Sequence, residues 1–373
     1  MTGLARVFPG RRTALPIIGA VVAVATFGDH PAPAVAVAVG FLLIGCVLAA
    51  VHHAEVVAHR VGEPFGSLLL AVAVTVIEVA LIVTLMVSGK GDTATLARDT
   101  VFAAVMITCN GIVGLSVMVA ALRRRTADFN AEGTATALAT VATMVTLGLV
   151  LPRFTTSHPG PQYSPSQLAF AAVASVALYA LFVFVQTVRH RDYFLPVAGE
   201  PSAPAGSAAS PDEGDAHAEP PAEREALKSL GLLLLALVAV VGLAKLESSP
   251  IEEAVEAVGA AQSAVGALIA LLVLLPEGLA AVRNARRGRV QTSFNLGFGS
   301  AMASIGLTIP AIAIASIWLD GPLVLGIDAT QMVLLALTVV VGALTVLPGR
   351  ATVQEGGIHL VIFAAFLFLA IHP

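Results

Sequence analysis

"VTVIEVALIVTL", residues 74–85, places a single carboxylate, Glu78, in a run that is otherwise apolar or small and hydroxylated. "LLVLLPEGLAA", residues 271–281, does the same with Glu277. A charged side chain at the centre of a bilayer costs about 2.5–3.5 kcal/mol on insertion scales. Two such positions in one chain therefore indicate either that both carboxylates face one internal site and bind a cation or protons there, or that each forms local hydrogen bonds that only stabilise helix packing.

The composition of the chain is that of a helical membrane protein. Of its 373 residues, 57% are hydrophobic and 12% are charged, whereas a soluble domain carries about 25% charged residues. Several uncharged runs reach the roughly 20 residues that a spanning helix needs, and the alternating segments of a membrane β-barrel do not occur. The predicted fold class is all-α and polytopic. The formal net charge of −4 gives no reason to expect a nucleic-acid partner.

Eleven apolar runs are predicted to span the membrane. The first has the basic flank of a signal peptide without a convincing cleavage site, so we expect it to remain as a helix. Cys46 and Cys109 fall inside apolar runs and are expected to be buried packing residues rather than a disulfide or a metal pair. The predicted spans cover approximately 14–28, 33–52, 67–88, 101–122, 135–152, 166–188, 227–244, 262–282, 296–318, 328–347 and 357–371.

The basic residues predict the orientation of these spans. If the connecting segments alternate between the two sides, the side of the N-terminus receives 16 of the 20 Lys and Arg residues. Short loops rich in Lys and Arg stay in the cytoplasm. The N-terminus is therefore expected in the cytoplasm and the C-terminus, after eleven spans, outside.

A Pro-, Ala-, Ser- and acid-rich stretch, 196–223, is too polar to bury a core and predicts a flexible linker. Its acids suggest either a solvated tether or a regulatory cation sensor. The expected organisation is an N-terminal segment with the first helix (1–32), a first repeat (33–188), an acidic cytoplasmic linker (189–226) and a second repeat (227–373).

The two halves carry the same pattern. Each has five spans with its glutamate on the second, and a Gly-rich span follows, in which "VGLSV" (113–117) aligns with "IGLTI" (305–309). Because five is odd, two such repeats lie in the membrane with opposite polarity. Inverted repeats that meet near the midplane are the architecture of secondary transporters.

The polar residues at this depth predict a cation site made of oxygen ligands. Calcium takes six to eight oxygens, and two glutamates supply at most four. Each hydroxyl in these spans can also bond only to its own helix backbone. Soft transition metals fit poorly because no thiolate or His pair lies at the depth of these glutamates. The candidate metal ligands are Glu78, Glu277, Asn110, Ser300, Thr108, Ser304 and Thr75, with both glutamates also carrying protons and Pro276, Gly111 and Gly299 as helix interruptions.

Residues 51–82, "VHHAEVVAHRVGEPFGSLLLAVAVTVIEVALI", and 275–310, "LPEGLAAVRNARRGRVQTSFNLGFGSAMASIGLTIP", resemble the bacterial ChaA-type Ca²⁺/H⁺ antiporters of the cation/Ca²⁺ exchanger superfamily. The resemblance implies two inverted five-helix repeats in the bacterial inner membrane and the exchange of Ca²⁺ for H⁺ without a cofactor. It also implies that Glu78 and Glu277 bind the cation and the protons. The Gly-Asn-x-Pro-Glu core of the superfamily is absent before Glu78, which leaves K⁺ and Na⁺ as alternatives.

Other function classes fit the sequence less well. A channel with a ring of carboxylates would need several subunits, and no nucleophile–base pair or HExxH motif of an enzyme occurs in a span. The sequence does not predict an oligomeric state.

Two polar segments outside the predicted site are open to more than one interpretation. His52, His53 and His59 form either a cytoplasmic pH sensor or an interfacial anchor. In "LESSPIEEAVEAVGAA" (246–261), Ser249 and Pro250 suggest the start of a helix. Glu247 and Glu256, within the same stretch, suggest an electrostatic collar at the outer mouth.

Overall fold

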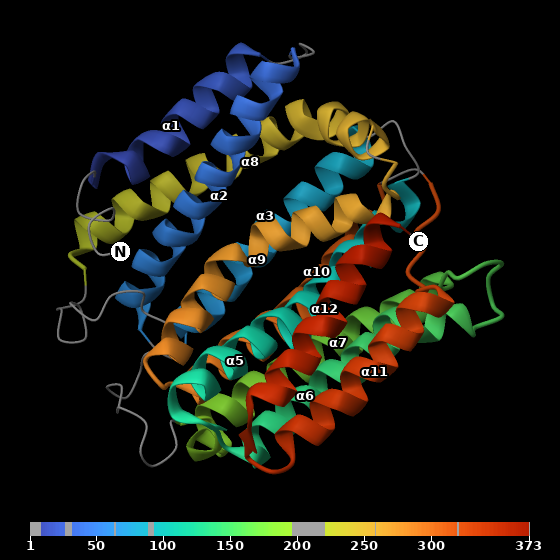
Figure 1. Cartoon of the computed structure of the whole chain (residues 1–373). Helices are drawn as coiled ribbons and strands as arrows, with labels where there is room; N and C mark the ends of the chain where they lie inside the picture. The colour runs from blue at the N-terminus through green and yellow to red at the C-terminus, as the bar shows by residue number, and fades with distance from the viewer. Residues whose placement is uncertain are drawn as a thin grey trace. The chain divides into compact units, whose positions relative to one another are not determined.

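The computed structural model describes residues 9–26, 32–62, 65–88, 93–195, 221–257, 259–318 and 321–372, which are almost wholly helical (Figure 1). Within these ranges ten helical stretches are long and apolar enough to cross a membrane, and the apolar part of α1, Thr13–Ala25, is shorter. This confirms the all-α polytopic fold class. The α-helices are α1 (Pro9–Ala25), α2 (Pro33–Val61), α3 (Phe65–Ser88), α4 (Leu96–Met106), α5 (Val113–Arg124), α6 (Ala131–Val145), α7 (Pro165–Phe184), α8 (Glu223–Ala257), α9 (Ser263–Arg286), α10 (Val290–Ala315), α11 (Ala329–Val346) and α12 (Val353–Ile371).

Shorter elements continue several of these helices. Three are π-helical segments, in which the backbone bonds reach one residue further than in an α-helix. They are η2 (Ile107–Ile112), η3 (Thr146–Val150) and η5 (Val185–Arg189), and the 3₁₀ turns are η1 (Thr93–Thr95), η4 (Leu151–Arg153) and η6 (Arg191–Phe194).

The chain forms two compact units. Unit 1 consists of Met1–Thr93 and His217–Val258 and contains α1, α2, α3 and α8. Unit 2 consists of Ala94–Ala216 and Gly259–Pro373 and contains the remaining helices. Each unit therefore combines helices from both predicted repeats.

In unit 1, α8 packs along α1 and α2, and α3 packs against α2 and α8. The approach of α1 to α2 is close, because a Cβ at Gly19 would collide with the Sγ of Cys46. Cys46 and Cys109 are both buried and free, which confirms the prediction that they are packing residues. In a bilayer, close van der Waals packing of these helices at small residues, rather than removal of apolar surface from water, thus accounts for the assembly of this unit.

The predicted break within α8 is wrong. The helix runs through Pro250, where the sequence suggested a new helix start capped by Ser249. A proline removes only one backbone donor, and in the preceding turn the Ser248 hydroxyl donates to the Lys245 carbonyl over 2.9 Å. Glu247 is consequently buried in the unit, 5% exposed, with its Oε2 3.8 Å from a Cβ placed at Gly40 of α2.

This burial also corrects the collar interpretation. A collar needs solvent-exposed charges that attract ions from outside. Glu256 is exposed, but Glu247 packs within the helices of unit 1. The two residues therefore do not form one exposed acidic rim.

Unit 2 is built around the continuous helix α4–η2–α5. This helix contacts α9, α10 and α12, and every residue of η2 is buried. The helices α5, α12 and α11 lie side by side (Figure 1). At one end, two short strands that the sequence did not predict, β1 (Ala127–Asp128) and β2 (Arg350–Ala351), pair antiparallel and join the end of α5 to the start of α12.

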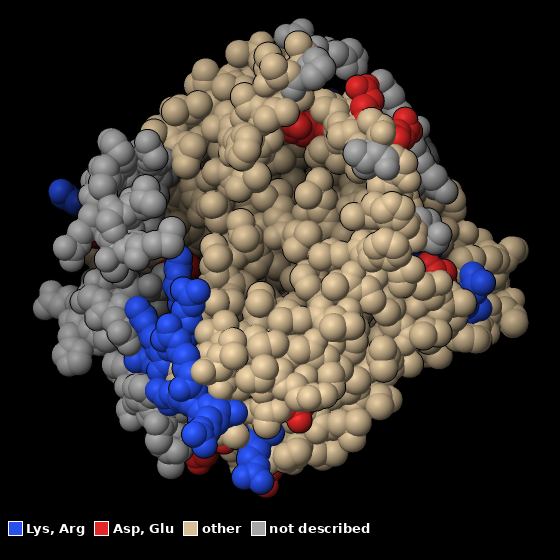
Figure 2. Space-filling model, in the orientation of Figure 1, with Lys and Arg blue, Asp and Glu red and all other residues tan. Residues whose placement is uncertain are grey.

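Basic side chains gather at the end of unit 2 where α5 and α9 terminate. Arg123 donates to the carbonyl of Arg286 over 3.2 Å, and Arg124 donates to the carbonyl of Arg287 over 3.4 Å. Figure 2 shows a band of Lys and Arg side chains on one face of the molecule. Arginines from the two predicted repeats thus share one end of this unit.

Most of the predicted linker, residues 196–220, lies outside the described residues. Its beginning is ordered against unit 2, because Asn295 of α10 donates to the carbonyl of Phe194 over 2.7 Å and Phe194 is buried. Its end is already helical, since α8 begins at Glu223.

Candidate functional site

Glu78 lies in the interior of unit 1. It is 4% exposed and sits on α3, whose residues around it are apolar. Thr75, one turn earlier, is also buried, and its hydroxyl donates to the carbonyl of Ala71 over 2.9 Å. This bond leaves the lone pairs of the Thr75 oxygen for another partner.

Glu277 belongs to unit 2 and is half-buried, with its Oε2 inside the protein. It sits on α9, which stays α-helical on both sides of Pro276. A Cβ at Gly278 would lie 3.8 Å from the side chain of Ile112. The turn of α9 that carries Glu277 therefore packs against the π segment η2.

Asn110 and Thr108 lie on η2, in the middle of the long helix α4–η2–α5. Asn110 is fully buried; its Nδ2 donates to Thr338 of α11 over 2.9 Å, and its Oδ1 is 3.1 Å from Nδ1 of His359 on α12. The hydroxyl of Thr108 donates to the Ala104 carbonyl over 2.7 Å. Gly111 is part of the π segment, so the predicted interruption there takes the form of a wider turn.

Ser300 and Ser304 lie on α10, which is an uninterrupted α-helix through Gly299. Ser304 is buried and Ser300 is half-buried. A Cβ at Gly297 would lie 3.8 Å from the carbonyl of Thr108, which places α10 directly against η2.

Unit 2 therefore brings together three of the elements that carry predicted ligands, namely α9, α10 and η2. Glu78 and Thr75 are held by unit 1. Among the described residues, no group of three or more His, Cys, Asp or Glu side chains is arranged to hold a metal ion. A cation beside Glu277 would thus depend on amide, hydroxyl and carbonyl oxygens, which Ca²⁺ and alkali cations accept.

Sequence reasoning missed three polar residues of unit 2: His359, Thr338 and Thr345. His359 is 1% exposed, and its Nε2 lies 3.1 Å from the hydroxyl of Thr345. The available signal was a lone histidine in "GGIHLVIFAAF", residues 356–366. A single polar residue in an apolar run is expensive to bury unless it is hydrogen-bonded.

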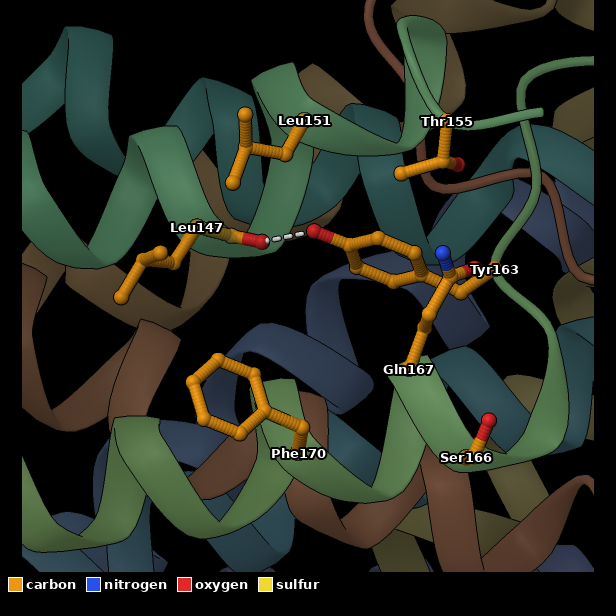
Figure 3. Close-up of a pocket in the computed structure, with 7 residues that line it drawn as sticks. All are labelled: Leu147, Leu151, Thr155, Tyr163, Ser166, Gln167 and Phe170. Atoms are coloured by element: carbon orange, nitrogen blue, oxygen red, sulfur yellow. Dashed lines mark hydrogen bonds between the residues drawn. The ribbon is translucent and has the colours of Figure 1, made fainter. Parts of the chain in front are cut away.

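A cavity of about 270 Å³ lies between η3, η4 and the start of α7. Figure 3 shows the hydroxyl of Tyr163 directed at the carbonyl of Leu147, to which it donates over 2.5 Å. Burial raises the pKa of Tyr163 to about 12. The cavity is lined by Leu147, Leu151, Thr155, Tyr163, Ser166, Gln167 and Phe170, none of which is a predicted ligand.

Comparisons with known proteins identify relatives over nearly the whole chain. The family described as sodium/calcium exchanger protein matches residues 32–188 and 228–372. The chain is 46% identical over 367 residues to y4hA of Sinorhizobium fredii (strain NBRC 101917 / NGR234), provisionally named an ionic transporter, with 96% of this chain and 95% of the relative covered. It is 32% identical over 352 residues to the sodium-potassium/proton antiporter ChaA of Escherichia coli (strain K12), with 93% of each covered. The solved structure of native YfkE has a TM-score of 0.71 at 15% identity, covering 97% of this chain and all of that one.

Proposed function

The chain belongs to the sodium/calcium exchanger protein family, and from that premise we propose that it exports Ca²⁺ in exchange for protons. It is a membrane-embedded cation antiporter rather than an enzyme. Its predicted location is the bacterial inner membrane, with the N-terminus in the cytoplasm and the C-terminus outside.

The observation that carries the proposal is the burial of Glu78 at 4% exposure within the apolar helix α3. Glu277, the corresponding glutamate of the second predicted repeat, sits on a helix that packs against the polar segment η2. A carboxylate in such surroundings is stable when a cation or a proton neutralises it. Two ionised glutamates suit one divalent cation, and two protonated ones form a neutral site. Because each state excludes the other, cation and protons move in opposite directions by alternating access.

Na⁺ or K⁺ is the second candidate for the transported cation. The relative ChaA is named as a sodium-potassium/proton antiporter. "VTVIE", residues 74–78, also lacks the amide that the superfamily places before its first glutamate. The same two glutamates would then bind a monovalent cation, and the proton-coupling argument is unchanged.

The test is flux into proteoliposomes with and without an imposed pH gradient, with Ca²⁺, Na⁺ and K⁺ supplied separately. We expect Ca²⁺ to give the largest flux and the flux to depend on the gradient. Glu78→Gln and Glu277→Gln should each abolish it, because each removes a charge and a proton carrier. Glu253→Gln, at an exposed position on α8, is the matched control.

Three outcomes would contradict the proposal in different ways. Gradient-driven flux in a folded glutamine variant would exclude the two-glutamate mechanism. A cation flux that is the same with and without the pH gradient would indicate a channel. An apparent cation affinity that stays constant as the pH falls from about 9 to 6 would exclude competition between cation and protons at one site.

A further inference from the structure

A buried network of hydrogen bonds links η2, α11 and α12 in unit 2. It connects the amide of Asn110 to the ring of His359 and to the hydroxyl of Thr338. The other ring nitrogen of His359 contacts Thr345, and all four side chains are at most 2% exposed. A buried polar network of this kind is stabilising when every member has a partner.

The bonds determine which atom donates at each step. The Thr338 hydroxyl gives its proton to the carbonyl of Leu334 over 2.8 Å, so its oxygen accepts from Asn110. The Asn110 atom facing Thr338 is therefore the nitrogen, and its oxygen faces His359. Because an amide oxygen cannot donate, Nδ1 of His359 carries the ring proton. In the neutral ring Nε2 then accepts from the hydroxyl of Thr345.

The backbone fixes the place from which His359 reaches Asn110. A Cβ at Gly114 would lie 2.9 Å from the Cβ of His359 and 3.2 Å from the carbonyl of Gly356. A Cβ at Gly356 would lie 2.8 Å from the backbone nitrogen of Met118. The two glycines thus let α5 and α12 meet backbone to backbone, and the His359 ring has little freedom to withdraw.

We propose that His359 is a positioning residue of the exchanger, whose Nδ1–H holds the amide oxygen of Asn110 in the orientation needed for cation binding. The inference rests on the proposed function and on the prediction that Asn110 is one of the cation's ligands; η2, which carries Asn110, packs against the turn of α9 that bears Glu277. An amide oxygen has two lone pairs, so the bond from His359 leaves one for the transported cation. The π turn in η2 sets the position of the Asn110 backbone. The hydrogen bond from His359 then sets the orientation of the Asn110 side-chain amide.

Two substitutions at His359 separate this role from simple packing. The Nδ2 of asparagine occupies nearly the place of the histidine Nδ1, whereas the Nε2 of glutamine occupies nearly that of the histidine Nε2. His359→Asn therefore keeps the donor to Asn110 and loses the contact with Thr345. His359→Gln does the reverse while filling more of the ring volume.

The experiment measures the apparent KM for Ca²⁺ and the maximal rate in proteoliposomes for both variants and for Thr345→Val. We expect His359→Gln to raise the KM about tenfold, as loss of one hydrogen bond that orients a buried ligand predicts. His359→Asn and Thr345→Val should stay within about twofold of wild type, since each retains the donor to Asn110. A packing role predicts the opposite order for the two His359 variants, because glutamine fills the space better.

Several results would overturn the inference. Equal KM values for the two His359 variants, alongside normal wild-type exchange, would overturn it without touching the proposed function. A wild-type protein that exchanges no cation for protons would overturn both. Nitrogen-15 NMR of histidine-labelled wild-type protein gives an answer that needs no variant to fold: we expect one ring protonated at Nδ1, and protonation of the His359 ring at Nε2 alone would refute the proposed bond.

Discussion

The helices that follow the two predicted site glutamates differ between the halves of the chain. In the first half, three helices after α3 each contain a π segment: η2, η3 and η5. Their counterparts in the predicted repeat order, α10, α11 and α12, are α-helical throughout their described lengths. The aligned segments "VGLSV" (113–117) and "IGLTI" (305–309) are both α-helical, so the halves differ in the turn that precedes them, which is π-helical only in the first half.

This difference changes which backbone and side-chain groups need hydrogen-bond partners in the two halves. A π turn shifts the backbone bonds and leaves carbonyls that need other partners. At η3 the Tyr163 hydroxyl binds the carbonyl of Leu147, and at η2 the side chain of Asn110 is held from two neighbouring helices. Among the predicted ligands, the first half thus holds an amide fixed by two hydrogen bonds, and the second half holds Ser300 and Ser304 on a regular α-helix.

The largest expected effect comes from removing the oriented amide. Asn110→Ala should abolish exchange or raise the KM beyond measurement, because it deletes a proposed ligand. It should also lower the free energy of unfolding by about 1–3 kcal/mol, since the buried hydrogen bonds of the amide to Thr338 and His359 are lost. Flux and thermal unfolding in detergent measure the two effects. Ser300→Ala, in the half-buried position on α10, should cost far less stability, and equal losses in both variants would remove the contrast between the halves.

The second test concerns the contact between α5 and α12. Gly114→Ala should destabilise the protein by about 1–3 kcal/mol and raise the KM, because the added Cβ pushes against His359 and the backbone of Gly356. Gly299→Ala on α10 is the matched control, since its Cβ would meet nothing within 4 Å. The control should be neutral or slightly stabilising, given the higher helix propensity of alanine. If Gly114→Ala changed neither the stability nor the KM, α12 would be able to move away from α5 without an energetic cost.

A smaller effect is expected at the second π segment. Tyr163→Phe should cost about 1 kcal/mol of stability through the lost bond to Leu147, with exchange unchanged. The folded-state pKa of Tyr163 is about 12, above the ordinary tyrosine value of 10.0. The contribution of the neutral hydroxyl is thus complete below about pH 10 and is lost as the pH rises through about 12. The stability difference between variant and wild type, from thermal unfolding, should be constant between about pH 6 and 9, and a difference that varies in this range would contradict the assignment.

The smallest effect is expected at Glu247, a buried carboxyl on α8 that the predicted glutamate pair does not include. Its Oε1 is buried without a hydrogen-bond partner among the described residues. Glu247→Gln should leave flux within about twofold of wild type and should not lower the melting temperature, because a neutral amide is less costly to bury than a carboxylate. Loss of flux comparable to that of Glu78→Gln would show that unit 1 carries a second functional acid.

Much of the fold follows from the sequence, because spanning helices are marked by length and hydropathy. The eleven predicted runs all coincide with helices. The errors lie at charged residues near helix ends. The predicted span 33–52 ends at His52, although α2 continues to Val61, and the predicted span 227–244 ends before Lys245 and Glu247, although α8 continues to Ala257. A charged residue indicates where the membrane-embedded part of a helix ends, but the helix itself can continue beyond that residue.

The candidate site was less predictable from the sequence. Asn110 and the two glutamates stand out because polar atoms are rare in apolar runs, and their roles remain predictions. The π turns leave no mark in composition or periodicity, since one extra residue per turn changes the spacing only locally. His359 was missed for a different reason: its partner Asn110 lies 249 positions away in the chain, and only the tertiary fold brings the two together.

The ladder of β1 and β2 has a practical consequence for anyone who labels this protein. Ala127 pairs with Ala351 and Asp128 with Arg350, so both connections are fixed in register. A fluorophore, epitope or reporter domain inserted into either segment would offset the pairing and pull on α5 and α12 together. The exposed residues 156–160, between η4 and α7, take part in no such pairing and offer a safer attachment point for following exchange in living cells.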